Sequence, residues 1–285
     1  MPYPGREEKR MKKTLMALAA LALVLSGCLQ TETKITVDSA GAGTIERTLV
    51  LRSDVVEMMK GMQAFDSSRK DASIFDENKL RTEASSLGEG VRFVSAAPVR
   101  TGSGEGYRAV YSFRDISRLR VNQTPGSAVS EAGMDPSGTA EEYLTFSFTR
   151  GNPARLVIHL YQSAADGPGA EPRGGQGGPV EDEDDDADDE EAALGAETLR
   201  QFYGDMKLLL TLEAGRTIVE SDADYRSGNT VTLMDLDFEA LSGNPEAFDL
   251  LARNKIGTLE EMKEFSRKYP GIRLESKKEV TIRFR

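Results

Sequence analysis

The chain has 285 residues, a formal net charge of -11, one histidine and one cysteine. A single cysteine excludes an intramolecular disulfide, and one histidine with one cysteine argues against a zinc site. The acidic balance argues against nucleic acid as a partner, because nucleic acid binds basic surfaces. The length is enough for one large domain or two small ones.

The first distinctive stretch is the segment 11–28, with the sequence MKKTLMALAALALVLSGC. Two lysines precede an apolar run over 15–25, which is shorter than the about 20 residues that a membrane-spanning helix needs. Small residues follow the run. This order is typical of a secretory signal peptide, so we predict that 1–27 is removed on export. Residues 1–10 have no signal character, and we expect translation to start at Met11.

The tetrapeptide Leu25-Ser26-Gly27-Cys28 places the only cysteine directly after these small residues. It resembles the lipobox of bacterial lipoproteins. The resemblance implies that Cys28 is acylated, for example with palmitate, and becomes the first residue of the mature chain. Leu29 at the next position implies sorting to the periplasmic face of the outer membrane, if the cell has one. The alternative is a chance thiol at the end of an ordinary signal peptide.

The strands nearest Cys28 are predicted from strict alternation of apolar and polar residues. The stretches 31–37 and 44–51 show this alternation and are separated by a turn with two glycines, so we expect a hairpin close to the membrane. Ser53 is a candidate cap for a helix over 54–65, and a second helix is expected over 76–87.

Four further strands are expected before the middle of the chain. Alternation predicts strands at 91–95 and 107–113, and a second hairpin formed by 143–149 and 155–161. Asp115 is expected to cap a short turn between these two pairs.

The middle of the chain has a composition that opposes folding. Residues 163–180 contain six glycines and three prolines, and ten of the eleven residues in 181–191 are Asp or Glu. Such a segment cannot bury enough apolar surface to offset the entropy lost on ordering, so we predict that 163–191 is disordered. The default interpretation of the acidic run is that its like charges repel one another and remain hydrated. Loose calcium binding or contact with a basic partner are the alternatives.

The chain after this segment alternates between strand and helix patterns. The expected elements are a helix ending at 205, strands over 206–213, 216–221 and 230–236, helices over 245–254 and 258–269, and one long strand over 272–284.

Together these elements predict an α+β fold, in which a mostly antiparallel β-sheet built from hairpins packs helices on one face. The residues 28–162 and 192–285 are expected to be two parts of one domain, interrupted by the disordered acidic segment. Two domains joined by that segment remain the alternative.

Candidate chemistry is sparse. His159 is the only histidine, and alternation places it on a half-exposed strand face with Val157 and Tyr161. No Gly-x-Ser-x-Gly motif supplies a nucleophile, and Cys28 is committed to the lipid. We therefore predict no catalytic residue and no cofactor site.

Two groups of carboxylates are candidates for a metal site or an acid–base site. The segment 222–229 has Asp222 and Asp224 at the spacing of an EF-hand start, but Arg226 occupies a ligand position and Leu233 stands where the closing glutamate is required. No metal site is predicted. Asp235 and Asp237 form a possible carboxylate pair, for which capping of the next helix is the alternative.

The first half also carries a family resemblance. Ile35-Thr36-Val37-Asp38, the following turn and the strand over 44–51 look like the opening of LppM-type bacterial lipoproteins, and Tyr111-Ser112-Phe113-Arg114-Asp115-Ile116 adds to the likeness. The resemblance covers 28–160. It implies a β-rich domain with helices and a possible amphiphile-binding surface, and it transfers no functional residues.

The sequence thus predicts a non-catalytic, lipid-anchored protein of the cell envelope that binds an amphiphile or an envelope protein. One alternative is a hydrolase of envelope polymer with Asp235 and Asp237 as acid and base. The other is a structural spacer whose acidic segment contacts a basic partner.

Overall fold

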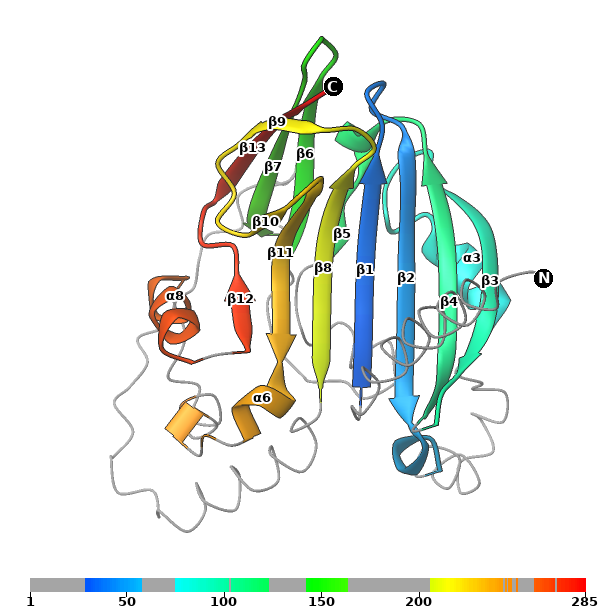
Figure 1. Cartoon of the computed structure of the whole chain (residues 1–285). Helices are drawn as coiled ribbons and strands as arrows, with labels where there is room; N and C mark the ends of the chain where they lie inside the picture. Colours follow the sequence, from blue (N-terminus) through cyan, green and yellow to red (C-terminus); the bar gives the residue numbers. More distant parts are fainter. Residues whose placement is uncertain are drawn as a thin grey trace, which may run out of the picture.

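The computed structural model describes residues 29–57, 75–102, 104–122, 142–163, 206–242, 244, 246–247, 250, 259–269 and 271–285. These residues form two β-sheets with a few short helices (Figure 1). The predicted β-rich, mostly antiparallel architecture is confirmed, but the strands divide between two sheets. The signal peptide, Cys28 and the acidic run lie outside the described residues.

The larger sheet has the strand order β10-β11-β8-β1-β2-β4-β3, with β12 paired to β11. Its strands are β1 (Leu29–Val37), β2 (Gly43–Arg52), β3 (Arg92–Arg100), β4 (Gly104–Phe113), β8 (Lys207–Ala214), β10 (Arg226–Ser227), β11 (Thr230–Asp237) and β12 (Ile272–Leu274).

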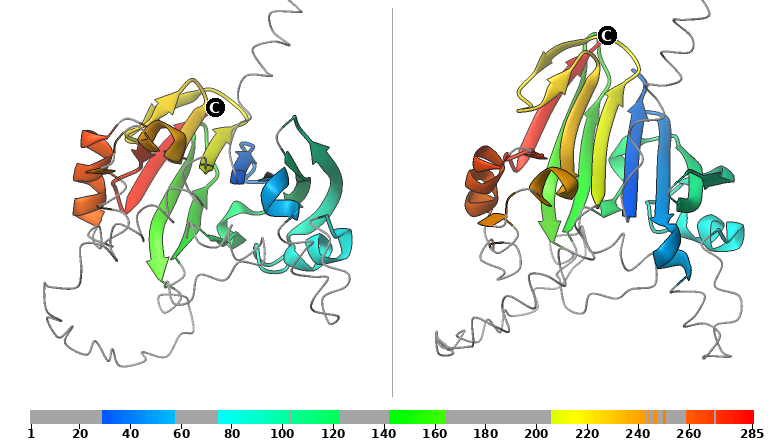
Figure 2. Two further views of the ribbon diagram at one scale, coloured as in Figure 1. Left: turned by 90° about the horizontal axis from the view of Figure 1, so that it is seen from below. Right: turned by 60° about the horizontal axis from the view of Figure 1, so that its bottom comes forward.

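The smaller sheet has the order β5-β6-β7-β13-β9 and lies behind β8 and β11 (Figures 1 and 2). Its strands are β5 (Val121–Asn122), β6 (Glu142–Thr149), β7 (Ala154–Ser163), β9 (Ile218–Ser221) and β13 (Glu279–Phe284). The predicted hairpin of β6 and β7 is confirmed.

The strand β1 lies inside the larger sheet and is paired along both sides. It runs antiparallel to β2, from Leu29 opposite Leu51 to Val37 opposite Gly43. On its other side it runs parallel to β8, along which Val37 lies opposite Ala214. Strands from both sides of the segment 164–205 therefore share one sheet.

One hydrophobic core joins the two sheets. Alternate residues of β4 and β8 are buried, namely Tyr107, Ala109, Tyr111, Phe113, Leu208, Leu210 and Leu212. They lie in one cluster with buried residues of the smaller sheet, namely Leu144, Leu156, Ile158, Ile282 and Phe284. The β1–β2 turn closes one end of this core, because Gly41 packs directly on the ring of Phe148 in β6.

The described helices are short. They include α3 (Glu77–Glu83), which contacts β3, the 3₁₀ turn η2 (Ile116–Arg118), α6 (Phe238–Ser242) and α8 (Leu259–Lys268), which contacts β12. Residues 53–57 are also helical, and the rest of the helix predicted over 54–65 lies outside the described residues. The predicted cap at Asp115 is confirmed, since its side chain accepts one backbone N–H bond in η2. Asp76, the expected first residue of its helix, is the N-cap of α3 and accepts two backbone N–H bonds.

The prediction of one long strand over 272–284 is wrong. The segment forms β12 in the larger sheet and β13 in the smaller sheet, and the chain crosses between the sheets at 275–278. The strand breaks at Glu275, whose side chain is fully buried and accepts backbone N–H groups. A second crossing, at 222–225, leads from β9 to β10.

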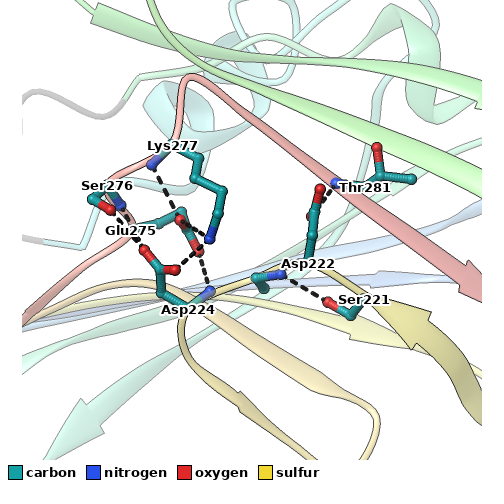
Figure 3. A network of polar contacts seen from close by, with 8 residues as sticks. Ser221, Asp222, Asp224, Glu275, Ser276, Lys277 and Thr281 are labelled. Atoms are coloured by element: carbon teal, nitrogen blue, oxygen red, sulfur yellow. Dashed lines mark hydrogen bonds and ion pairs between the residues drawn. The ribbon is translucent and has the colours of Figure 1, made fainter.

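These two crossings are tied together by a polar network that we call the crossover clasp, formed by Asp224, Glu275, Ser276 and Lys277 (Figure 3). The two carboxylate oxygens of Glu275 accept the N–H groups of Asp224, at 2.7 Å, and Lys277, at 3.1 Å. The carboxylate of Asp224 accepts the Ser276 hydroxyl at 2.7 Å and forms an ion pair with Lys277. The crossover clasp thus supplies hydrogen-bond acceptors for backbone N–H groups at the points where the chain passes from one sheet to the other.

The clasp also shifts the pKa values of its members. Burial raises the pKa of Glu275, and the N–H bond from Asp224 offsets only part of this effect. Burial also disfavours ionisation of Asp224, but hydrogen bonds from Lys277 and Ser276 outweigh burial and hold its pKa well below the usual range. Asp224 is therefore the ionised partner of Lys277 down to strongly acidic pH.

We predict that Asp224→Asn lowers the free energy of unfolding by about 1–3 kcal/mol at neutral pH, because Lys277 loses a charged hydrogen-bond partner. The pKa of Asp224 is lower in the folded state, so its contribution is present above the unfolded pKa and is lost as the pH falls through the folded pKa. The difference between variant and wild type should shrink below about pH 4 in urea unfolding followed by circular dichroism.

The matched control is Glu220→Gln, which breaks an exposed ion pair with Arg283 in the smaller sheet. It should change the free energy of unfolding by less than about 0.5 kcal/mol. A loss for Asp224→Asn that equals the control, or that grows in acid, would contradict the role of the clasp.

Candidate functional site

The clearest group of potentially reactive side chains lies on the outer face of the smaller sheet. Ser147, His159 and Glu279 stand on the neighbouring strands β6, β7 and β13. The Ser147 Oγ atom lies 2.8 Å from His159 Nε2, and His159 Nδ1 lies 2.9 Å from Glu279 Oε1. With the proton on Nδ1, His159 donates to Glu279 and accepts from Ser147. This is the order of a nucleophile, a base and an orienting carboxylate.

A serine nucleophile also needs N–H donors aimed at the oxyanion that forms during acyl transfer. The N–H of Phe148 already donates to Ser117 Oγ at 3.1 Å. Successive amides of a strand point to opposite edges, so the N–H of Ser147 points into the ladder with β7, where Ser147 lies opposite Val157. The two amides nearest to the Ser147 hydroxyl are therefore both engaged.

The row is also open to solvent. The side chain of His159 is 25% exposed and that of Glu279 is 64% exposed. Without an oxyanion hole from the adjacent amides, the geometry fits a cross-strand hydrogen-bond chain better than a catalytic site.

The predicted half-exposed position of His159 is confirmed, but its two partners were missed. The expected β6–β7 hairpin carries enough information to bring Ser147 near His159. No local signal could place Glu279 beside them, because β13 lies more than a hundred residues further along the chain.

The carboxylate pair of Asp235 and Asp237 does not form an acid–base site. Asp237 Oδ1 accepts the N–H of Ala240 at 3.2 Å and so caps α6, while Oδ2 lies 3.3 Å from the Lys207 ammonium. Burial raises the pKa of Asp235, against the opposing charge of Arg273. The helix-capping alternative is correct for Asp237.

The loop 222–229 places its carboxylates away from any shared centre. Asp224 belongs to the crossover clasp, and Asp222 Oδ1 accepts the N–H of Thr281 in β13 at 2.7 Å (Figure 3). Within the described part of the chain, no group of three or more His, Cys, Asp or Glu residues could hold a metal ion.

A shallow hollow of about 500 Å³ lies between α3 and the start of β3. It is lined by Arg81, Ala84, Ser85 and the segment Gly88-Glu89-Gly90-Val91-Arg92-Phe93. The Arg81 guanidinium lies 4.5 Å from the centre of the Phe93 ring, and that ring contacts Tyr111 edge to face. The hollow therefore joins an aromatic wall to the Arg81 guanidinium, which also pairs with Glu77.

We predict that Ser147 does not react with a fluorophosphonate probe, because the adjacent amides cannot stabilise an oxyanion. The measurement is labelling of the purified full chain, followed by peptide mass spectrometry, with a serine esterase as positive control. Labelling of Ser147 that is lost in His159→Gln, with Glu220→Gln as an unaffected control, would show instead that the row is a catalytic site.

None of the described helices is long and apolar enough to span a membrane. No protein-family model matches the chain, and no curated protein matches it either. Among solved structures, the chain is similar to the folded domain of the Mycobacterium tuberculosis protein LppM, determined by NMR, with 11% sequence identity and a TM-score of 0.30. The match covers 75% of this chain and 86% of that domain. At this TM-score the likeness carries no argument about function, so the proposals below depend on the residues of this chain.

Proposed function

We propose that this protein is a lipid-anchored component of the cell envelope that binds a partner and performs no catalysis. The observation that carries the proposal is the position of Cys28. It ends a lipobox-like tetrapeptide and directly precedes Leu29, the first residue of β1. Acylation of Cys28 would hold the two-sheet body at the membrane surface with a single peptide link.

The non-catalytic part of the proposal is supported by the structural hydrogen bonds that the candidate reactive side chains make. Asp237 caps a helix, Asp224 holds a crossing of the chain, and the row ending at Ser147 has its nearest amides engaged. These groups stabilise strand and helix ends in the part of the chain that the structure describes.

The hollow beside α3 is the best candidate for a ligand. Phe93 offers an apolar wall, and Arg81 can bind an anionic group by charge-assisted hydrogen bonds. An amphiphile with an anionic head has both properties. An envelope protein that presents an acidic side chain is the second candidate partner.

The experiment that tests the anchor follows incorporation of labelled palmitate in a bacterial host. Wild type should take the label and remain in the membrane fraction, whereas Cys28→Ser should lose both, because the acceptor thiol is absent. Ser26→Ala is the matched control, since it keeps a small residue at the same tetrapeptide and should retain the label. Label in Cys28→Ser would refute the proposal.

The binding arm uses mass spectrometry of lipids that copurify with the natively anchored protein. We expect an amphiphile or protein that is retained by wild type and by Arg155→Ala, and that is lost in Arg81→Ala. Recovery of wild type with nothing bound under mild conditions would count against a binding role.

A further inference from the structure

The strands of the larger sheet start and end at two opposite sides of the sheet. We call these two sides its edges, meaning the rows of strand ends and not the outermost strands. We define the anchor edge as the one where β1 begins, marked by Leu29, Arg52, Gly102, Lys207 and Glu239. Leu29 lies opposite Leu51, and Arg52 opposite Gly104, which places the β3–β4 turn at this edge. Lys207 lies opposite Asp237, so α6 begins there too. This edge is at the bottom of Figure 1.

The far edge is marked by Ala40 in the β1–β2 turn and by Arg216 after β8. Val37 lies opposite Ala214 there, and the N–H of Gly215 donates to the carbonyl of Val37 at 2.7 Å. At about 3.3 Å per residue, β1 separates the two edges by about 26 Å. A headgroup layer is only about 5–8 Å thick, so the two edges lie at different depths whenever β1 stands away from the membrane plane.

We infer that the anchor edge faces the lipid headgroups in the mature protein and that β1 holds the far edge away from the bilayer. The inference depends on the proposed acylation of Cys28. Leu29 directly follows the proposed lipid site in the sequence, so one peptide link would join the acylated residue to the first residue of this edge.

The link between anchor and body is stiff. Leu29 is 5% exposed and already belongs to the ladder with β2, and β8 pairs with β1 from Gln30 onward. Lengthening the tether would require removing β1 from both neighbours, which would open the core of the larger sheet.

The position of β1 within the sheet also limits tilting. β8 and β11 extend the edge on one side of β1, and β2, β4 and β3 extend it on the other. At about 4.8 Å between strands, the body has support at both sides of its attachment point. Attachment near the middle of this edge therefore resists tilting of the body within the plane of the sheet.

Two basic groups described at the anchor edge, Lys207 and Arg52, are paired with acids. Lys207 Nζ lies 2.9 Å from Glu239 Oε2 and 3.3 Å from Asp237 Oδ2. Arg52 Nη2 lies 2.6 Å from Asp54 Oδ2. These basic groups are paired with acids on the same edge, so attraction to anionic lipid is not required. The orientation should form on neutral phosphocholine vesicles.

The chain contains no tryptophan, so one introduced tryptophan reports one position. Gly102→Trp is placed at the anchor edge, where an added Cβ atom would meet no other atom within 4 Å. Ala40→Trp marks the exposed far edge. Each acylated full-length protein is inserted into phosphocholine vesicles that carry nitroxide groups on their lipid heads, and tryptophan fluorescence is measured.

Fluorescence of Gly102→Trp should be strongly quenched relative to unlabelled vesicles, while Ala40→Trp should keep its intensity. Glu239→Trp and Arg216→Trp form a second pair at exposed positions and should repeat the contrast. Equal quenching at both edges, or stronger quenching at the far edge, would overturn the orientation alone. Absence of acyl groups on the purified wild type would refute the proposed function, and the inference would fall with it.

Discussion

The structure depends on the pairing of β1 along both of its sides. Its antiparallel ladder with β2 is local, but its parallel ladder with β8 joins residues far apart in the sequence. The ladder between β1 and β8 closes a long loop of chain. The entropy cost of closing a loop grows only with the logarithm of its length, so this loop costs little more than one half as long. A long intervening segment is therefore compatible with the shared sheet. The same strand follows the proposed lipid site, so one element joins the anchor to both parts of the body.

A two-sheet fold of this kind requires the chain to cross between sheets, and each crossing exposes backbone groups that leave their ladders. At the crossings beside Asp224 and Glu275, side-chain carboxylates accept those N–H groups. A buried carboxylate is costly unless it is hydrogen-bonded, and Glu275 is bonded to two backbone amides. Polar residues in this stretch thus have a structural role, which weakens their use as evidence for metal binding or catalysis.

Much of the local structure could be predicted from the sequence, because hairpins arise from alternation and turn residues that are close together. The ladder between β1 and β8 could not, since no local pattern in either strand names its partner. The prediction of one strand over 272–284 ran through residues 275–279, which are Glu-Ser-Lys-Lys-Glu and contain the crossing between the sheets. The row of Ser147, His159 and Glu279 was missed for the same reason as the parallel ladder: it requires the register of three strands.

The central claim, that β1 holds both parts of the chain in one cooperative sheet, is tested most directly by hydrogen exchange. Amide exchange of the natively folded protein is followed by mass spectrometry through increasing urea concentrations. Peptides from β1, β2 and β8 should exchange only through one common opening, with the same free energy and the same dependence on urea. Exchange of β8 through a separate, less costly opening while β1 and β2 stay protected would contradict the account.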